Sequence, residues 1–208
     1  MPKQHLYQRK PDLFREIEIT KFLVSFTGQI EHVVFPAGVF DELLYVQYET
    51  VWGPDWSPLS GLMSGSSQMA RVGDNPERVV FNMPLEMVFS STNVSGWPQL
   101  VITVRAQNMI GGDTLRGYAV VPLPATAGAR ARAAPLLRPR AATALGEWLA
   151  WLTGRHPELA EPSMLASGKE NYLLEKIYYL PCVATKMSTY IHRKLSYHTH
   201  SNRVITKQ

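Results

Sequence analysis

The chain has 208 residues, of which 45% are hydrophobic and 18% are charged, and its formal net charge is +4. This composition excludes a wholly disordered chain and fits one folded domain with extensions. The single cysteine, Cys182, excludes an internal disulfide framework and a zinc site made of cysteines. Since no apolar run approaches the roughly 20 residues that cross a bilayer, we expect a soluble, intracellular protein.

The first third of the chain predicts an extension followed by two strands. Residues 1–19 are mostly polar with mixed charges, and we expect them to form an N-terminal extension. Residues 22–35 predict a strand with a kink at Gly28. Residues 43–52 predict a second strand, because they are rich in aromatic and β-branched side chains. The Ser- and Gly-rich stretch that follows, 56–75, indicates a long loop with one short strand near 66–72.

Two strands flanking a turn are predicted in the middle of the chain. Every second residue of 79–89 is apolar, which predicts a strand with one buried face. Residues 100–104 are apolar or β-branched on both faces, as in a central strand. Gly96 in the turn can take a positive φ, so we interpret the whole as an antiparallel hairpin with Trp97 closing one end of the core. Pro84 cannot donate to a ladder, so we expect an edge or a bulge there.

The last third of the chain mixes several kinds of segment. Residues 115–121 predict a strand, and residues 125–140 form a basic connector whose prolines exclude a long helix. Residues 141–153 are rich in Ala and Leu and predict the best helix of the chain. Residues 172–189 predict one or two strands, and residues 191–208 a basic, histidine-containing tail. The arginines of the connector are Arg130, Arg132, Arg138 and Arg140.

Together these segments predict the fold class. Short strands separated by turn signals, with one helix in a late connection, indicate an all-β protein built as an antiparallel β-sandwich. We expect one domain over residues 20–190, flanked by the extension and the tail.

Glycines, tryptophans and prolines of the central segments carry a resemblance to a known family. The residues concerned are Gly53, Asp55, Trp56, Asn93, Gly96, Trp97, Pro98, Gln99, Arg116, Gly117 and Tyr118. In this order and spacing they resemble the B9 domain family. The resemblance covers residues 26–162 and is loose after Ser163, and the first twenty or so residues extend beyond the usual start of the family.

The resemblance implies both a fold and a role. The fold would be a C2-like β-sandwich of about eight strands. Members of the family are non-enzymatic subunits of a complex at the ciliary transition zone, near the basal body and the cytoskeleton. They associate with paralogous B9 proteins and with transmembrane proteins, and the complex supports cilium assembly and a diffusion barrier. The resemblance therefore implies a hetero-oligomeric scaffold protein of the cytoplasm at the cilium base.

The residues themselves give little sign of metal or catalytic chemistry. Calcium-binding C2 domains cluster aspartates in their loops, because Ca²⁺ takes about six to eight oxygen ligands. The loop aspartates of this chain are scattered singly, at Asp41, Asp55, Asp74 and Asp113. The chain also has no nucleophile elbow, metalloprotease helix or phosphate-binding glycine loop. We therefore expect no enzyme activity, metal, cofactor or small-molecule substrate, and no nucleic-acid partner.

The basic connector leaves two interpretations open. Its arginines could be a solvated loop, or they could contact an acidic partner or an acidic membrane surface. In the second case the protein would be a peripheral membrane module that recognises acidic phospholipids. This is the alternative to the scaffold interpretation, and the two are compatible.

Overall fold

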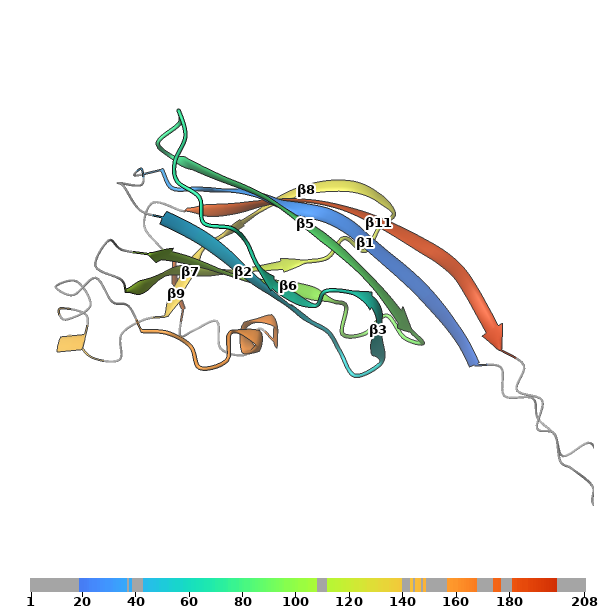
Figure 1. The fold of residues 1–208 in the computed structure, drawn as a ribbon. Coiled ribbons are helices and arrows are strands. Elements are labelled where there is room, and N and C mark those ends of the chain that lie inside the picture. Colours follow the sequence, from blue (N-terminus) through green and yellow to red (C-terminus); the bar gives the residue numbers. More distant parts are fainter. Residues whose placement is uncertain are drawn as a thin grey trace, which may run out of the picture.

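The computed structural model describes residues 19–36, 38, 43–107, 112–139, 143, 145–146, 148, 157–167, 174–176 and 181–197. Two antiparallel sheets pack face to face within this part of the chain (Figure 1). The strand order is β3-β5-β1-β11-β8 in the five-stranded sheet and β10-β9-β7-β6-β2-β4 in the six-stranded sheet. The predicted all-β antiparallel sandwich is confirmed.

The elements follow one another along the chain with few irregular segments between them. Their bounds are β1 Ile19–Val34, β2 Leu43–Val51, β3 Trp56–Gly61, β4 Ser64–Ser66, β5 Arg78–Ser91, β6 Gln99–Gln107, β7 Asp113–Pro122, β8 Gly128–Pro135, β9 Leu137–Pro139, the 3₁₀ helix η1 Pro162–Ser167, β10 Leu174–Lys176 and β11 Cys182–Tyr197. Three of the strands, β4, β9 and β10, have only three residues each. The described residues thus contain more strands than the eight or so expected, and the difference lies in these three short strands.

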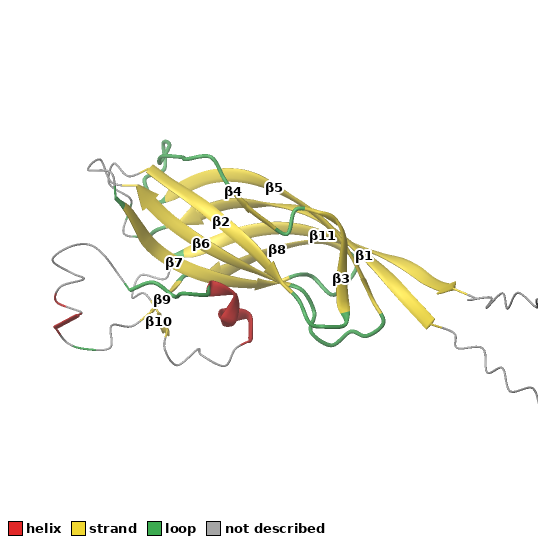
Figure 2. Cartoon of the chain, turned by 60° about the horizontal axis from the view of Figure 1, so that its bottom comes forward, coloured by secondary structure: helices red, strands yellow, loops and turns green. Residues whose placement is uncertain are grey.

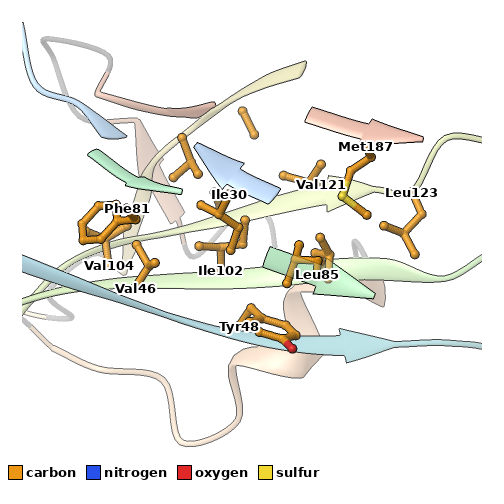
Figure 3. Close-up of a cluster of buried hydrophobic side chains, with 14 of the residues drawn as sticks. Ile30, Val46, Tyr48, Phe81, Leu85, Ile102, Val104, Val121, Leu123 and Met187 are labelled. Atoms are coloured by element: carbon orange, nitrogen blue, oxygen red, sulfur yellow. The ribbon is translucent and has the colours of Figure 1, made fainter. Parts of the chain in front are cut away.

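The core lies between the two sheets and follows the alternation of the strands. Figure 3 shows Ile30 and Leu85 from the five-stranded sheet meeting Val46, Ile102 and other side chains of the six-stranded sheet. All four are almost completely buried. Every second residue of β5 points into this layer, as the alternation over 79–89 predicts.

Strands β1 and β11 run side by side through the middle of the five-stranded sheet (Figure 1). The predicted kink at Gly28 is wrong, because the pairing is regular there and the register shifts of β1 lie between Lys21 and Leu23 and between Ile30 and His32. Gly28 is needed for close packing: a Cβ there would lie 2.2 Å from the Lys186 carbonyl oxygen of β11. A glycine inside a strand can mark a bend or a close backbone approach, and here it marks the approach.

The predicted hairpin of the central segment is wrong. Strands β5 and β6 are consecutive, but β5 pairs with β1 and β3, whereas β6 pairs with β2 and β7. The turn after Ser91 therefore carries the chain from one sheet to the other. Alternation predicts the two strands correctly but contains no information about which neighbour each one pairs with.

The segment predicted as a long loop with a short strand near 66–72 contains two edge strands, both of which begin earlier. Beyond β4 there is only an isolated bridge between Ala70 and Leu44. Strand β3 pairs with residues 87–91 of β5, and β4 pairs with residues 47–49 of β2. The rest of β5 does not pair with β3. Pro84 lies in this part of β5, where its one strand neighbour is β1, in which it pairs with Gln29. The prediction that Pro84 lies on an edge is confirmed. Propensity missed β3 because its Ser, Pro and Gly residues are held by pairing rather than by intrinsic preference.

The late part of the chain also differs from the prediction. The basic connector is largely β8 and β9, and β8 pairs with residues 182–189 of β11. The helix predicted over 141–153 lies mostly outside the described residues, although Leu145, Gly146 and Trp148 are helical. Residues 1–18 and 198–208 also lie outside them. Among the described residues no helix is long and apolar enough to span a membrane.

Candidate functional site

Two segments that carry the family residues meet at one end of the sandwich, and we call this contact the tryptophan lock. It joins residues 52–56, before β3, to residues 91–99, between β5 and β6. The Gly53 amide donates to the Gly96 carbonyl at 2.8 Å. A Cβ on Gly96 would lie 2.5 Å from the Gly53 Cα, and Gly96 has a φ of +66°. Neither position has room for a side chain, so both glycines are required by the contact itself.

The two indole rings of the lock pack against each other and donate to the backbone. The ring centroids of Trp56 and Trp97 are 4.9 Å apart, with the planes at 79°. The Trp56 indole nitrogen donates to the Ser95 carbonyl at 2.7 Å, and the Trp97 indole nitrogen donates to the Leu123 carbonyl at 2.9 Å. Phe89 packs on Trp56 from β5. Edge-to-face packing and satisfied indole donors are what a buried tryptophan pair needs to be stable.

Polar side chains complete the lock. The Asn93 side-chain amide donates to the Asp55 carboxylate at 3.3 Å, and the Asn93 side-chain oxygen accepts from the Ser95 amide at 3.0 Å. The Ser91 hydroxyl accepts from the Asn93 amide at 3.1 Å and lies 2.9 Å from the Asp55 carbonyl oxygen. Asp55 is thus a turn residue of the lock.

The last two residues of the central signature leave the turn and enter β6. The Pro98 carbonyl accepts from the Leu123 amide at 3.1 Å. The Gln99 side-chain amide donates to the Ala166 carbonyl in η1 at 3.3 Å. Gln99 therefore ties the helix η1 to the start of β6, and Figure 2 shows η1 beside the six-stranded sheet.

The remaining family residues lie on β7, away from the lock. Arg116 is the extra residue of a bulge, because Gly117 pairs with Val104 whereas Leu115 pairs with the next residue of β6. Tyr118 is 1% exposed, and its hydroxyl accepts from the Leu159 amide at 3.2 Å. Burial raises the pKa of Tyr118. This group therefore packs the segment before η1 onto the outer face of the six-stranded sheet.

The arginines of the basic connector divide between the two sheets. Arg130 and Arg132 are exposed on β8, and the register places them on the face that carries Met187 and Thr185 of β11. Arg138 is half-buried on β9, and its Nε donates to the Arg116 carbonyl at 3.0 Å. Burial lowers the pKa of both Arg138 and Arg116, and the positive charge of Arg138 lowers that of Arg116 further. Arg140 lies outside the described residues.

A surface that sequence reasoning missed lies on the opposite side of the sandwich. Residues 56–70 contain β3 and β4 and carry no charged side chain. Three of their apolar side chains are exposed, those of Leu59, Leu62 and Met69. The lack of charge over this stretch is visible in the sequence, but the stretch looked like a loop.

A groove lies beside β4 on the outer face of the six-stranded sheet, with a volume of about 540 Å³. Its lining includes Glu49, Thr103 and Pro162 and contains no histidine, cysteine or lysine. Among the described residues no group of three or more His, Cys, Asp or Glu side chains could hold a metal ion. Asp41 lies outside them, and the Asp113 carboxylate accepts from the Tyr45 hydroxyl at 2.7 Å.

The fold and these contacts define a class: an antiparallel β-sandwich whose signature residues contact one another and the backbone within the chain. Comparison with known proteins gives the family. The family described as "Ciliary basal body-associated, B9 protein" matches residues 24–188. The chain belongs to this B9 family, and the resemblance noted in the sequence is confirmed.

Individual relatives agree with this assignment. B9 domain-containing protein 1 of Xenopus laevis is 37% identical over 184 residues, which are 87% of this chain and 91% of that protein. The protein of the same name from Drosophila melanogaster is 37% identical over 191 residues, 86% of this chain and 78% of its own length. Human B9 domain-containing protein 2 is 27% identical over 151 residues, 70% of this chain and 82% of that protein. The family assignment places the chain among proteins of the cilium base.

Proposed function

We propose that this protein is a non-enzymatic scaffold subunit of the transition-zone complex at the cilium base, and that it acts by binding paralogous B9 proteins. One observation carries the proposal: the signature residues of the family make their contacts within this chain. Gly53, Gly96, Trp56 and Trp97 contact one another and the backbone of the same chain. Such a signature maintains a shape, so the function depends on the surfaces that the shape presents.

The relatives support this proposal. The chain resembles two different B9 proteins, and both matches run over most of the domain. In the proposed complex the chain contacts a paralogue of the second kind and transmembrane proteins of the transition zone, and through them it supports cilium assembly and the diffusion barrier.

Localisation with co-purification tests this role. A tagged copy expressed in a ciliated cell should concentrate just distal to the basal body and should recover paralogous B9 proteins. A tagged Trp97→Ala variant, in which the tryptophan lock is disrupted, should lose both. A diffuse signal for the wild-type protein, without B9 proteins in the eluate, would contradict the scaffold role.

A second candidate function is binding to an acidic membrane surface. Its support is the pair Arg130 and Arg132, which are exposed two residues apart on one edge strand. An arginine near an acidic membrane contributes about 1 kcal/mol, so two of them give weak, salt-dependent binding. Vesicles containing phosphatidylserine should bind the wild-type chain at low salt and should bind the Arg130→Gln/Arg132→Gln variant less. Equal binding of the two proteins would remove this candidate.

A further inference from the structure

One side of the sandwich is formed by residues 56–70, which we call the uncharged edge segment. Strand β3 is the outermost strand of the five-stranded sheet, and β4 is the outermost strand of the six-stranded sheet. A single stretch of chain therefore closes both sheets on this side. No residue of the segment is charged, whereas 18% of the whole chain is. Charged side chains on edges are the usual protection against pairing with another chain, and residues 56–70 have none.

Large apolar side chains are exposed along the segment. Leu62 is 72% exposed, Leu59 is 58% exposed and Met69 is 48% exposed. Single apolar residues on a surface are ordinary, but several in one uncharged segment at a sheet edge are typical of an interaction site.

The backbone holds Leu62 at the surface. Gly61 has a φ of +97°, and a Cβ there would lie 2.1 Å from the Glu86 carbonyl oxygen of β5. On the other side, the Leu62 carbonyl accepts from the buried Tyr48 hydroxyl at 3.1 Å. Because the backbone is fixed to both sheets, the Leu62 side chain remains exposed in the folded monomer.

The two strands of the segment differ in how well they are protected. Strand β3 contains Pro58, and a register shift lies between Pro58 and Ser60. Proline and bulges both hinder the addition of another strand. Strand β4 has the residues Ser64, Gly65 and Ser66 and is regular over its pairing with β2. The edge that can accept a further strand is therefore β4.

The groove lies next to β4 and adds a feature of shape. The register pairs Ser66 with Gln47 and Ser64 with Glu49, so the small serine side chains lie on the grooved face. The floor of the groove includes Thr103 of β6, and Pro162 of η1 forms part of its wall. Small side chains beside a groove leave space that the side chains of an added strand can fill.

We propose that the uncharged edge segment is the docking surface for a paralogous B9 domain, with a strand of the paralogue added to β4 and its apolar side chains against Leu59, Leu62 and Met69. This inference rests on the proposed function and specifies the surface that it uses. The exposed apolar side chains of the segment select an uncharged partner surface, because a charge buried against leucine side chains would lose its hydration without compensation.

The partner is a paralogue because the inference follows from the proposed function, and a paralogue shares the domain, as human B9 domain-containing protein 2 does with 27% identity over 151 residues. Two copies of this chain related by a twofold axis would pair β4 with β4. A second copy is therefore the other occupant that the experiment distinguishes.

The test measures binding between the full chain and its paralogue of the B9 domain-containing protein 2 type, both purified, by titration calorimetry. Leu62→Asp and Leu59→Asp should each weaken binding about tenfold or more, because a carboxylate would be buried at the centre of the contact. The matched control is Tyr190→Asp. Tyr190 is 55% exposed on β11, about 14 Å from β3 at the usual strand spacing. This control should change binding less than about twofold, and all variants should melt within a few degrees of the wild type.

The possible results distinguish a failure of the docking surface from a failure of the proposed function. If the wild-type proteins do not bind each other, the scaffold role fails, and this inference fails with it. If they bind and Leu62→Asp and Leu59→Asp bind equally well, only the docking surface is wrong. The same holds if Tyr190→Asp weakens binding as much as the two leucine variants. A wild-type homodimer in solution that Leu62→Asp dissociates would identify a second copy as the occupant and would overturn the choice of a paralogue.

Discussion

The two open sides of this sandwich differ in how far their edge strands are protected against pairing with another chain. On one side β8 presents Arg130 and Arg132, and the register places both on the face that continues the core. Charges in that position oppose the addition of another strand. On the other side the uncharged edge segment presents Leu59, Leu62 and Met69. One edge thus carries charges that oppose pairing with another chain, and residues 56–70 on the other side carry none.

The largest expected difference between the two sides is in the free energy of unfolding that is lost when a side chain of each edge strand is removed. Trp56 begins β3 and is 2% exposed, with its ring on Phe89 and Trp97. Trp56→Ala should lower the free energy of unfolding by about 3–5 kcal/mol, because it leaves a cavity and an unpaired carbonyl at Ser95. Arg130→Ala on the other side should change it by less than about 0.5 kcal/mol. Urea unfolding of the two variants gives both values, and equal losses would show that the two edges are anchored alike.

Two glycines with nearly equal φ angles, one on each side, allow the two edges to be compared directly. Gly61 on the uncharged side has a φ of +97°, and Gly128 at the start of β8 has a φ of +107°. A Cβ on Gly61 would meet the Glu86 carbonyl oxygen at 2.1 Å, whereas a Cβ on Gly128 would meet nothing within 4 Å.

Gly61→Ala should therefore destabilise the protein by about 3 kcal/mol or more, from conformational strain and overpacking together. Gly128→Ala should cost only about 1–2 kcal/mol, from conformational strain alone. Denaturant unfolding of both variants checks this order. A loss at Gly128 as large as the loss at Gly61 would mean that crowding at the β3 edge contributes nothing.

Removing the charges from the protected side tests whether they protect it. Arg130→Thr/Arg132→Thr keeps β-compatible side chains on β8 and should alter the free energy of unfolding by less than about 0.5 kcal/mol. It should increase concentration-dependent self-association, because the edge then resembles the uncharged side. Light scattering over a concentration series measures this, with Lys186→Thr as a control on the neighbouring strand. Scattering unchanged from the wild type would contradict a role of the two arginines in preventing self-association.

The last prediction concerns Tyr45 of β2, one strand in from the β4 edge of the six-stranded sheet. Burial and the hydrogen bond to Asp113 raise the pKa of Tyr45 to about 12, above its ordinary value of 10.0. The protonated phenol is favoured in the folded state. Its contribution is therefore complete below pH 10, where both states are protonated, and is lost as the pH rises toward about 12.

Urea unfolding between pH 9 and pH 12 (roughly the range in which a phenol titrates) should show a steeper loss of stability for the wild type than for Tyr45→Phe. The two edge variants Leu62→Asp and Arg130→Ala should follow the wild-type profile, because neither substitution touches Tyr45. Parallel profiles for the wild type and Tyr45→Phe would remove Tyr45 as the cause.

Local sequence patterns predicted the strands well where one face is buried. The alternation over 79–89 and the aromatic and β-branched run over 43–52 correspond to β5 and β2. Gly96 and Trp97 were predicted in the turn at one end of the core, and they lie there. Such patterns work because burial of one face imposes a period of two on the chain itself.

Pairing between strands that are distant in sequence decided the features that local patterns did not predict. The placement of β5 and β6 in different sheets, the close approach at Gly28, and the edge strands β3 and β8 all depend on hydrogen bonds to strands far along the chain. Ser, Gly, Ala and Arg have no strong preference for strands, so pairing with β5 and β11 determines their conformation. The sequence by itself therefore determined the fold class and the family. Only the tertiary structure decided which side of the sandwich is charged and which is open, because an edge is defined by the neighbour that a strand lacks.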